Sequence, residues 1–142
     1  MKKFNSILFW LISFTWGLPL TLFGTVVALG CLITGHKPHR FYQHIYFSFG
    51  VGGWGFEAGP FFFVSKDSEN DLKLKQHESG HGIQNLIFGP LMPIVVCIPS
   101  CIRFWYREWL VKYKGKRYSD LPPYDSIWFE GWATQLGQKY YK

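Results

Sequence analysis

Two histidines and a glutamate stand close together in the segment His77-Glu78-Ser79-Gly80-His81. On a helix, a spacing of four residues places both imidazoles on one face, about one turn apart and close enough to bind one metal ion. Neutral imidazole nitrogens with one oxygen ligand suit Zn²⁺ and leave a fourth position for water. The segment therefore predicts a site with Zn²⁺ as cofactor and with His77 and His81 as metal ligands.

Glu78 lies between the two predicted ligands and is directed toward the same region of the helix. In zinc peptidases with such a helix, this glutamate does not bind the metal. It accepts a proton from the attacking water and passes it to the leaving amine. We therefore expect Glu78 to be the catalytic residue.

The site needs a third protein ligand, for which Glu130 is the preferred candidate. It lies on an expected helix among aromatic residues, where a solvated charge has no evident purpose. The alternative is a simple carboxylate on a helix surface. Glu57, also in an apolar segment, is the reserve candidate. The remaining candidates, which are better interpreted as interfacial residues, are His36, His39 and His44.

The apolar residues of the chain are gathered in blocks. Residues 7–33 and 83–102 are almost free of charge, as expected for membrane-embedded segments and not for a soluble domain. We expect residues 4–34 to form an uncleaved membrane anchor, with a signal peptide after Met1-Lys2-Lys3 as the alternative. Pro19 is expected to kink this anchor or to break it into a re-entrant pair.

Three further regions position the predicted ligands. Residues 36–65 hold two β-rich runs separated by glycines, which predict a small β-hairpin or two short strands. Residues 72–110 contain the motif helix, expected over 72–88, and a second apolar helix. Residues 124–141 contain the helix of the third ligand.

Glu130 can reach the two histidines only if residues 72–110 form an antiparallel hairpin that dips into the bilayer and returns. The whole chain, residues 1–142, is then one domain of the α+β class. It is predicted to be a mainly α-helical membrane protein with membrane-embedded helices and a small β-hairpin.

The formal charge is +6, and a basic cluster follows the second apolar run. Its members are Arg103, Arg107, Lys112, Lys114, Lys116 and Arg117. Such a cluster is typical of a cytoplasmic segment that contacts anionic lipid. No nucleic-acid-binding motif accompanies it, so we expect membrane lipids as partners and no nucleic acid. The predicted location is a bacterial inner (plasma) membrane, with the site on the cytoplasmic side.

A His-Glu-x-x-His helix followed by a glutamate on a later helix resembles the gluzincin zinc peptidases. The chain is most similar to the membrane-bound zinc endopeptidases of the CAAX-processing type. Their third ligand lies in a Glu-x-x-x-Asp segment, whose aspartate orients a ligand histidine. Here Glu130-Gly131-Trp132-Ala133-Thr134 matches the glutamate and places Thr134 at the position of the aspartate. Thr134 can accept a hydrogen bond but carries no charge.

The His-Glu-x-Gly-His-x-x-Gln core and the later Glu-x-Trp-Ala segment are also similar to a group of short, uncharacterised bacterial membrane proteins. This second resemblance covers most of residues 45–138 and implies a common architecture.

The resemblance to gluzincins also implies an edge strand that pairs with the substrate backbone. Phe61 to Ser65 is the candidate for this strand, with a core or lipid-facing strand as the alternative. A donor that stabilises the oxyanion is expected as well. The candidate donors are Tyr118, Tyr124, Arg103 and Arg107.

Together these features predict a zinc-dependent membrane-bound endopeptidase that hydrolyses peptide or membrane-protein substrates near the membrane surface. A non-catalytic zinc-binding membrane protein, acting as a partner-binding or immunity-type component, is the second hypothesis. The small size of the chain and the presence of Thr134 favour it. A basic membrane-surface module with an accidental motif is the third.

Overall fold

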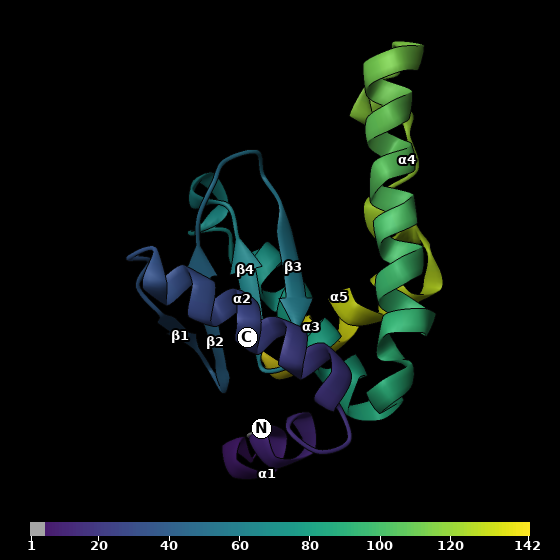
Figure 1. The fold of residues 1–142 in the computed structure, drawn as a ribbon. Coiled ribbons are helices and arrows are strands. Elements are labelled where there is room, and N and C mark those ends of the chain that lie inside the picture. The colour runs from purple at the N-terminus through teal and green to yellow at the C-terminus, as the bar shows by residue number, and fades with distance from the viewer. Residues whose placement is uncertain (1–4) are drawn as a thin grey trace.

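A small mixed sheet lies between two layers of helices in the computed structural model, which describes residues 5–142 (Figure 1). The expectation for Met1-Lys2-Lys3 falls outside these residues. The five α-helices are α1 (Ser6–Ser13), α2 (Leu18–Ile33), α3 (Leu72–Phe88), α4 (Ile98–Lys114) and α5 (Trp128–Tyr140). The strands are β1 (His39–Phe41), β2 (His44–Ser48), β3 (Gly55–Ala58) and β4 (Phe61–Val64). The predicted mixture of mainly helices with a small sheet is thus confirmed.

The N-terminal apolar segment is broken, as Pro19 predicted. The Asn5 side chain caps α1 by accepting hydrogen bonds from the backbone of Ile7 and Leu8 at 3.0 and 3.2 Å. Pro19 lies in the first turn of α2, where the absence of an N–H costs nothing. The two helices are bent by 99° relative to each other.

The sheet has the strand order β1-β2-β4-β3, and β2 pairs with β4 in parallel. The two β-rich runs therefore form two separate strands, as the alternative prediction had it, and the prediction that they form one hairpin is wrong. The tight turn lies at Gly59-Pro60, between β3 and β4, and these two strands are antiparallel. The glycine-rich segment 50–54 only carries the chain from β2 to β3.

The two faces of the sheet pack against different helices. One face carries Phe47, Ala58 and Phe63, which share a buried cluster with α2. The other face carries Tyr46, Phe62 and Val64, with Leu74 of α3 packed against them. The period of two along each strand therefore directs alternate side chains to α2 and to α3.

Helix α3 has the predicted bounds, but the chain after it takes a different course from the predicted hairpin. Asp71 caps α3 by accepting a hydrogen bond from the Leu74 N–H at 3.1 Å. A 3₁₀ turn (Gly89–Leu91) and a π-helical turn (Pro93–Cys97) then lead into α4. Helices Leu72–Leu91 and Pro93–Lys114 are bent by 115°, short of the full reversal of an antiparallel pair. The prediction of an antiparallel hairpin over 72–110 is thus wrong.

The return of the chain is made by the segment after α4, which runs back along that helix (Figure 1). Arg103 donates hydrogen bonds to the carbonyl oxygens of Tyr124 and Pro123 at 3.0 and 2.9 Å. Arg107 donates to the carbonyl oxygen of Pro122 at 2.5 Å. These contacts bring the chain back to the sheet-bearing part of the protein, where α5 begins.

Within residues 5–142, no helix taken alone has both the length and the apolar composition needed to cross a bilayer. Two pairs of helices, each with a sharp bend between its members, reach the required length and apolar composition when the two members are combined. They are α1 with α2, and Leu72–Leu91 with Pro93–Lys114.

Helices α3 and α5 pack with their backbones in direct contact. A Cβ atom added to Gly80 would lie 1.9 Å from the carbonyl oxygen of Ala133, and one added to Gly137 would lie 1.9 Å from that of Gln76. Both distances are far below van der Waals contact. Only glycine at these two positions allows the helices to approach this closely.

We predict that Gly80→Ala lowers the free energy of unfolding by about 1–3 kcal/mol, because the new methyl group must push α5 away from α3. The matched control is Gly30→Ala on α2, where an added Cβ meets nothing within 4 Å. The control should leave stability unchanged or raise it by up to about 1 kcal/mol, the helix propensity difference. Unfolding of the detergent-purified variants measures both. Equal stability of the two variants would contradict the proposed close contact.

Candidate metal centre

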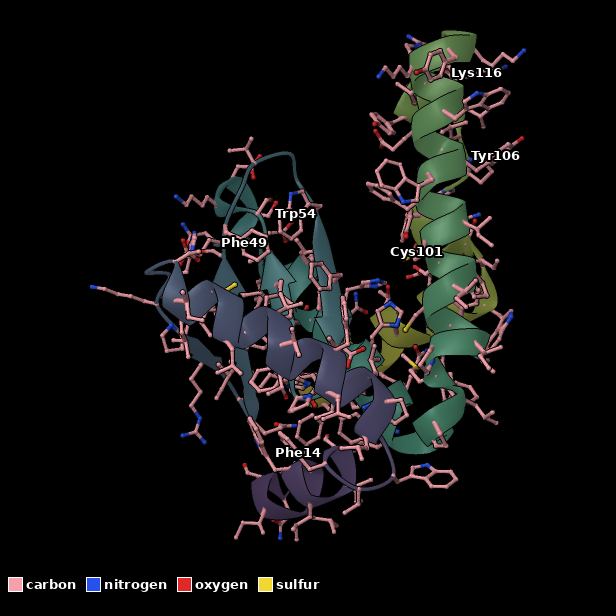
Figure 2. All side chains as sticks on the ribbon, in the orientation of Figure 1. Phe14, Phe49, Trp54, Cys101, Tyr106 and Lys116 are labelled. Carbon is pink, nitrogen blue, oxygen red and sulfur yellow. The ribbon has the colours of Figure 1, made fainter. Side chains whose placement is uncertain are left out.

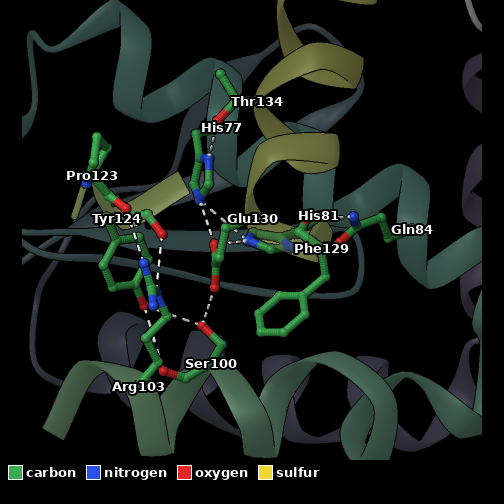
Figure 3. A network of polar contacts seen from close by, with 10 residues as sticks. All are labelled: His77, His81, Gln84, Ser100, Arg103, Pro123, Tyr124, Phe129, Glu130 and Thr134. Atoms are coloured by element: carbon green, nitrogen blue, oxygen red, sulfur yellow. Dashed lines mark hydrogen bonds and ion pairs between the residues drawn. The ribbon is translucent and has the colours of Figure 1, made fainter. Parts of the chain in front are cut away.

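His77, His81 and Glu130 meet at one point between α3 and α5 (Figure 3). The Glu130 Oε2 atom lies 3.0 Å from His77 Nε2 and 3.1 Å from His81 Nε2. The two Nε2 atoms are 3.2 Å apart. Each of the three residues offers one atom that could bind a metal ion, and these three atoms all lie within 4.8 Å of one another. This group can hold a metal ion, and it consists of the three residues predicted from the sequence.

The outer nitrogen of each imidazole is held by a hydrogen bond. His77 Nδ1 lies 2.9 Å from Thr134 Oγ1, and His81 Nδ1 lies 2.8 Å from Gln84 Oε1. Gln84 is itself oriented, because its amide nitrogen donates to the carbonyl oxygen of Phe129 at 2.8 Å. The amide oxygen of Gln84 therefore faces His81 and can only accept, which places a proton on His81 Nδ1.

This orientation leaves His81 Nε2 free to bind a cation. In a neutral His81 ring, Nε2 presents a lone pair toward the carboxylate oxygen of Glu130 at 3.1 Å. Two acceptors this close repel each other unless a cation lies between or beside them. A proton or a metal ion fulfils this requirement. The donor set of two imidazole nitrogens and one carboxylate oxygen fits a metal ion of the zinc type.

Glu130 is fully buried, with an exposed fraction of 0%. Burial raises the pKa of this carboxyl, but the contacts with His77, His81 and Ser100 outweigh burial and hold its pKa well below the usual value. Glu130 is therefore ionised at neutral pH, as a metal ligand must be. The alternative of a solvated carboxylate on a helix surface is excluded by this burial.

Ser100 and Tyr124 extend the site away from the histidines. The Ser100 hydroxyl donates a hydrogen bond to Glu130 Oε1, and the Tyr124 hydroxyl lies 3.2 Å from Ser100 Oγ. Burial raises the pKa of Tyr124 to about 12, so its hydroxyl keeps its proton. Arg103, which donates to the Tyr124 carbonyl, fixes the position of this residue.

Among the four candidate oxyanion donors, only Tyr124 has a side-chain donor in hydrogen-bonding contact with Ser100, the residue that contacts Glu130. Tyr118 instead donates to Glu108 Oε1 at 2.5 Å, far along α4. The guanidinium groups of Arg103 and Arg107 are engaged with backbone carbonyls of residues 122–124.

Glu78 lies on α3 between the two histidines and reaches β3, the strand that carries Glu57. A Cβ atom added to Gly55 of β3 would lie 2.7 Å from Glu78 Oε1. Burial raises the pKa of Glu78 to about 7, with a lowering contribution from His77 and a raising one from Glu130. Burial and then the charge of Glu78 raise the pKa of Glu57 well above its usual value. Glu57, the reserve ligand, is thus adjacent to the metal-ligating group and not part of it.

The three other candidate histidines lie elsewhere. His36 Nδ1 contacts the Thr34 hydroxyl at 2.9 Å, and His39 lies 3.4 Å from Glu69. His44 is fully buried in contact with aromatic rings, and burial lowers its pKa to about 3. None of the three belongs to the metal-ligating group of the described residues.

The strand at the edge of the sheet differs from the predicted one. β4, which holds Phe61 to Val64, pairs with β2 on one side and β3 on the other, so it offers no free edge. The edge strand beside α3 is β3. The prediction of Phe61 to Ser65 as the edge strand is therefore wrong, because parallel pairing places β4 inside the sheet.

Sequence reasoning missed the parts played by Gln84 and Ser100. Gln84 follows His81 by three residues, which on a helix places both side chains on one face, and this spacing could have identified it. Ser100 is far from Glu130 in sequence, and no local pattern points to their contact.

We predict that the protein purified with zinc binds about one equivalent, and that His81→Ala and Glu130→Gln each lose most of it, because each removes one of three ligands. His36→Ala is the matched control, since this imidazole contacts Thr34 and lies outside the group. Elemental analysis after dialysis measures the metal content. Zinc bound equally by all four proteins would overturn the ligand assignment.

Comparison of the chain with protein-family models, curated proteins and solved structures found no match. The residues that can hold a metal ion are His77, His81 and Glu130.

Proposed function

We propose that this protein is a zinc-dependent, membrane-bound peptidase that hydrolyses peptide bonds near the membrane surface. The observation that carries the proposal is the position of Glu78. It lies between the two histidines on α3, beside the His77–His81–Glu130 group and against the edge strand β3. A zinc ion bound by that group would polarise the peptide carbonyl and activate a water molecule.

In this proposal Glu78 is the general base. Its carboxylate accepts the proton of the attacking water and then passes it to the leaving nitrogen. Tyr124 donates a hydrogen bond to the oxyanion that develops on the carbonyl. Two features of Tyr124 support this role. Its hydroxyl keeps its proton, and it contacts the hydroxyl of Ser100, which in turn donates a hydrogen bond to Glu130.

Strand β3 holds the substrate backbone in this proposal. On the side away from β4 it pairs with no other strand of the described chain, and an extended peptide could pair with it there. Pairing along Gly55–Ala58 would bring the substrate past Glu78, which contacts the strand at Gly55.

We predict that Glu78→Gln keeps its zinc and loses hydrolysis by about 10²–10⁴-fold, because it removes the base and leaves the three ligands. Tyr124→Phe should lower kcat by roughly 10²-fold with little change in KM. Tyr118→Phe, the same change at an exposed tyrosine, is the matched control and should leave kcat unchanged. Cleavage of a peptide library by detergent-purified protein is the assay.

Two outcomes would contradict this assignment. Full activity in Glu78→Gln would remove Glu78 from the mechanism. Zinc retained without hydrolysis of any library member, even by the parent chain, would favour the alternative of a non-catalytic zinc-binding membrane protein with a partner-binding or immunity-type role.

Membrane attachment is proposed from the apolar side chains that the fold leaves uncovered. In α2 they include Leu22, Val26, Leu29 and Ile33, all exposed. On α4 the exposed residues Ile98, Ile102, Trp105, Trp109 and Tyr113 follow one another at three- and four-residue intervals, which places them on one face. Figure 2 shows Tyr106 and Lys116 on the part of α4 that stands away from the sheet. Apolar faces next to basic residues suit an anionic membrane surface.

We predict that a cysteine at position 26 is shielded by lipid. In a chain whose three native cysteines are replaced by alanine, Val26→Cys should resist a water-soluble maleimide in opened native membranes and react in detergent. Val51→Cys is the matched control and should react in both. The two valines are 68% and 76% exposed in the protein itself, so only the membrane can distinguish them. Equal labelling in membranes would refute lipid contact at α2.

A further inference from the structure

We propose that Glu57 binds an ammonium group of the substrate beside the metal centre. This inference deepens the proposed peptidase function and rests on it. It assigns to the protein a class of substrates that carry a positive charge close to the cleaved bond.

Glu57 is a buried carboxyl whose hydrogen-bonding capacity is only partly used. Its exposed fraction is 8%, and its Oε1 atom has no hydrogen-bond partner. The backbone N–H of Gly59 is the one donor that contacts the carboxyl. A buried polar atom without a partner costs roughly 1–3 kcal/mol. Such an atom beside a reaction centre is explained if a ligand supplies the partner.

The charge around Glu57 indicates what kind of partner fits. The charge of Glu78, which has the same sign, acts on the carboxyl of Glu57. No ion pair within residues 5–142 includes Glu57. A cation placed next to a buried carboxyl stabilises its ionised form. An ammonium group offers both the positive charge and N–H donors for Oε1.

The position of Glu57 on the edge strand indicates where this cation would come from. Gly55 and Glu57 are two residues apart on β3, and residues at this spacing lie on the same face of a strand. Gly55 is the residue in contact with Glu78. A peptide that pairs with β3 would therefore pass Glu78 and Glu57 within two residues of each other.

The first test measures binding and does not depend on turnover. Isoamylamine and the uncharged isoamyl alcohol are titrated by calorimetry into the zinc-loaded protein and into Glu57→Gln. The amine should bind the parent at least about 10-fold more tightly than the alcohol, the smallest effect expected of a charge-assisted hydrogen bond. This preference should vanish in Glu57→Gln and persist in Glu69→Gln, the same change at a surface glutamate paired with His39.

The second test distinguishes the two sources of an ammonium group, a free amino terminus and a lysine side chain. Three peptides of otherwise equal sequence are compared: one with a free amino terminus, one acetylated with a lysine near the cleaved bond, and one acetylated without lysine. The parent should favour one of the first two by about 10-fold in kcat/KM. Glu57→Gln should lose this preference, so that it cleaves the three peptides with similar kcat/KM.

The outcomes separate the inference from the proposed function. An amine preference that is equal in the parent and in Glu57→Gln overturns the ammonium site, whatever the peptidase assay gives. Loss of zinc in Glu57→Gln would also overturn it, since Glu57 would then be acting on the metal centre. Amine binding that depends on Glu57, in a chain that cleaves no peptide, would uphold the site and refute the peptidase.

Discussion

The contact of α3 with α5 is the constraint on which the site depends. Gly80 and Gly137 let the backbones of the two helices touch. Because the helices are this close, the carboxylate of Glu130 reaches the imidazoles of His77 and His81 without crossing a layer of side chains. The same contact brings Thr134 to His77 and the Phe129 carbonyl to Gln84. The ligands and the groups that orient them thus share one helix–helix interface.

The sheet supports this interface from the other side of α3. β3 carries Glu57, and its Gly55 contacts Glu78 of α3. Helix α4 contributes Ser100, and the segment that returns along it contributes Tyr124. Five separate regions of the chain therefore converge on one buried cluster of polar groups. In an apolar protein such a cluster is costly to bury, which favours a functional role for it.

The local features of the chain were predicted well. The spacing of His77 and His81, the bounds of α3 and the break at Pro19 follow from helical geometry and from the chemistry of proline, which act within a few residues. Glu130 was predicted as the third member of the His77–His81 group because a charged residue among apolar ones needs a partner, and the structure places it there. By contrast, the single hairpin, the antiparallel pair over 72–110 and the edge strand at Phe61 to Ser65 were wrong. Each of these depended on how distant segments pair.

The sequence by itself determined the three residues that can hold a metal ion, the helix that carries the motif and the mainly helical composition. Only the tertiary structure decided that β2 and β4 run parallel, that the chain returns along α4 through Arg103 and Arg107, and that Glu78 reaches β3 at Gly55. The physical reason is the range of the interactions. Side-chain spacing and capping act through neighbouring residues, whereas strand order and the contact of a helix side chain with a strand depend on the packing of the whole chain.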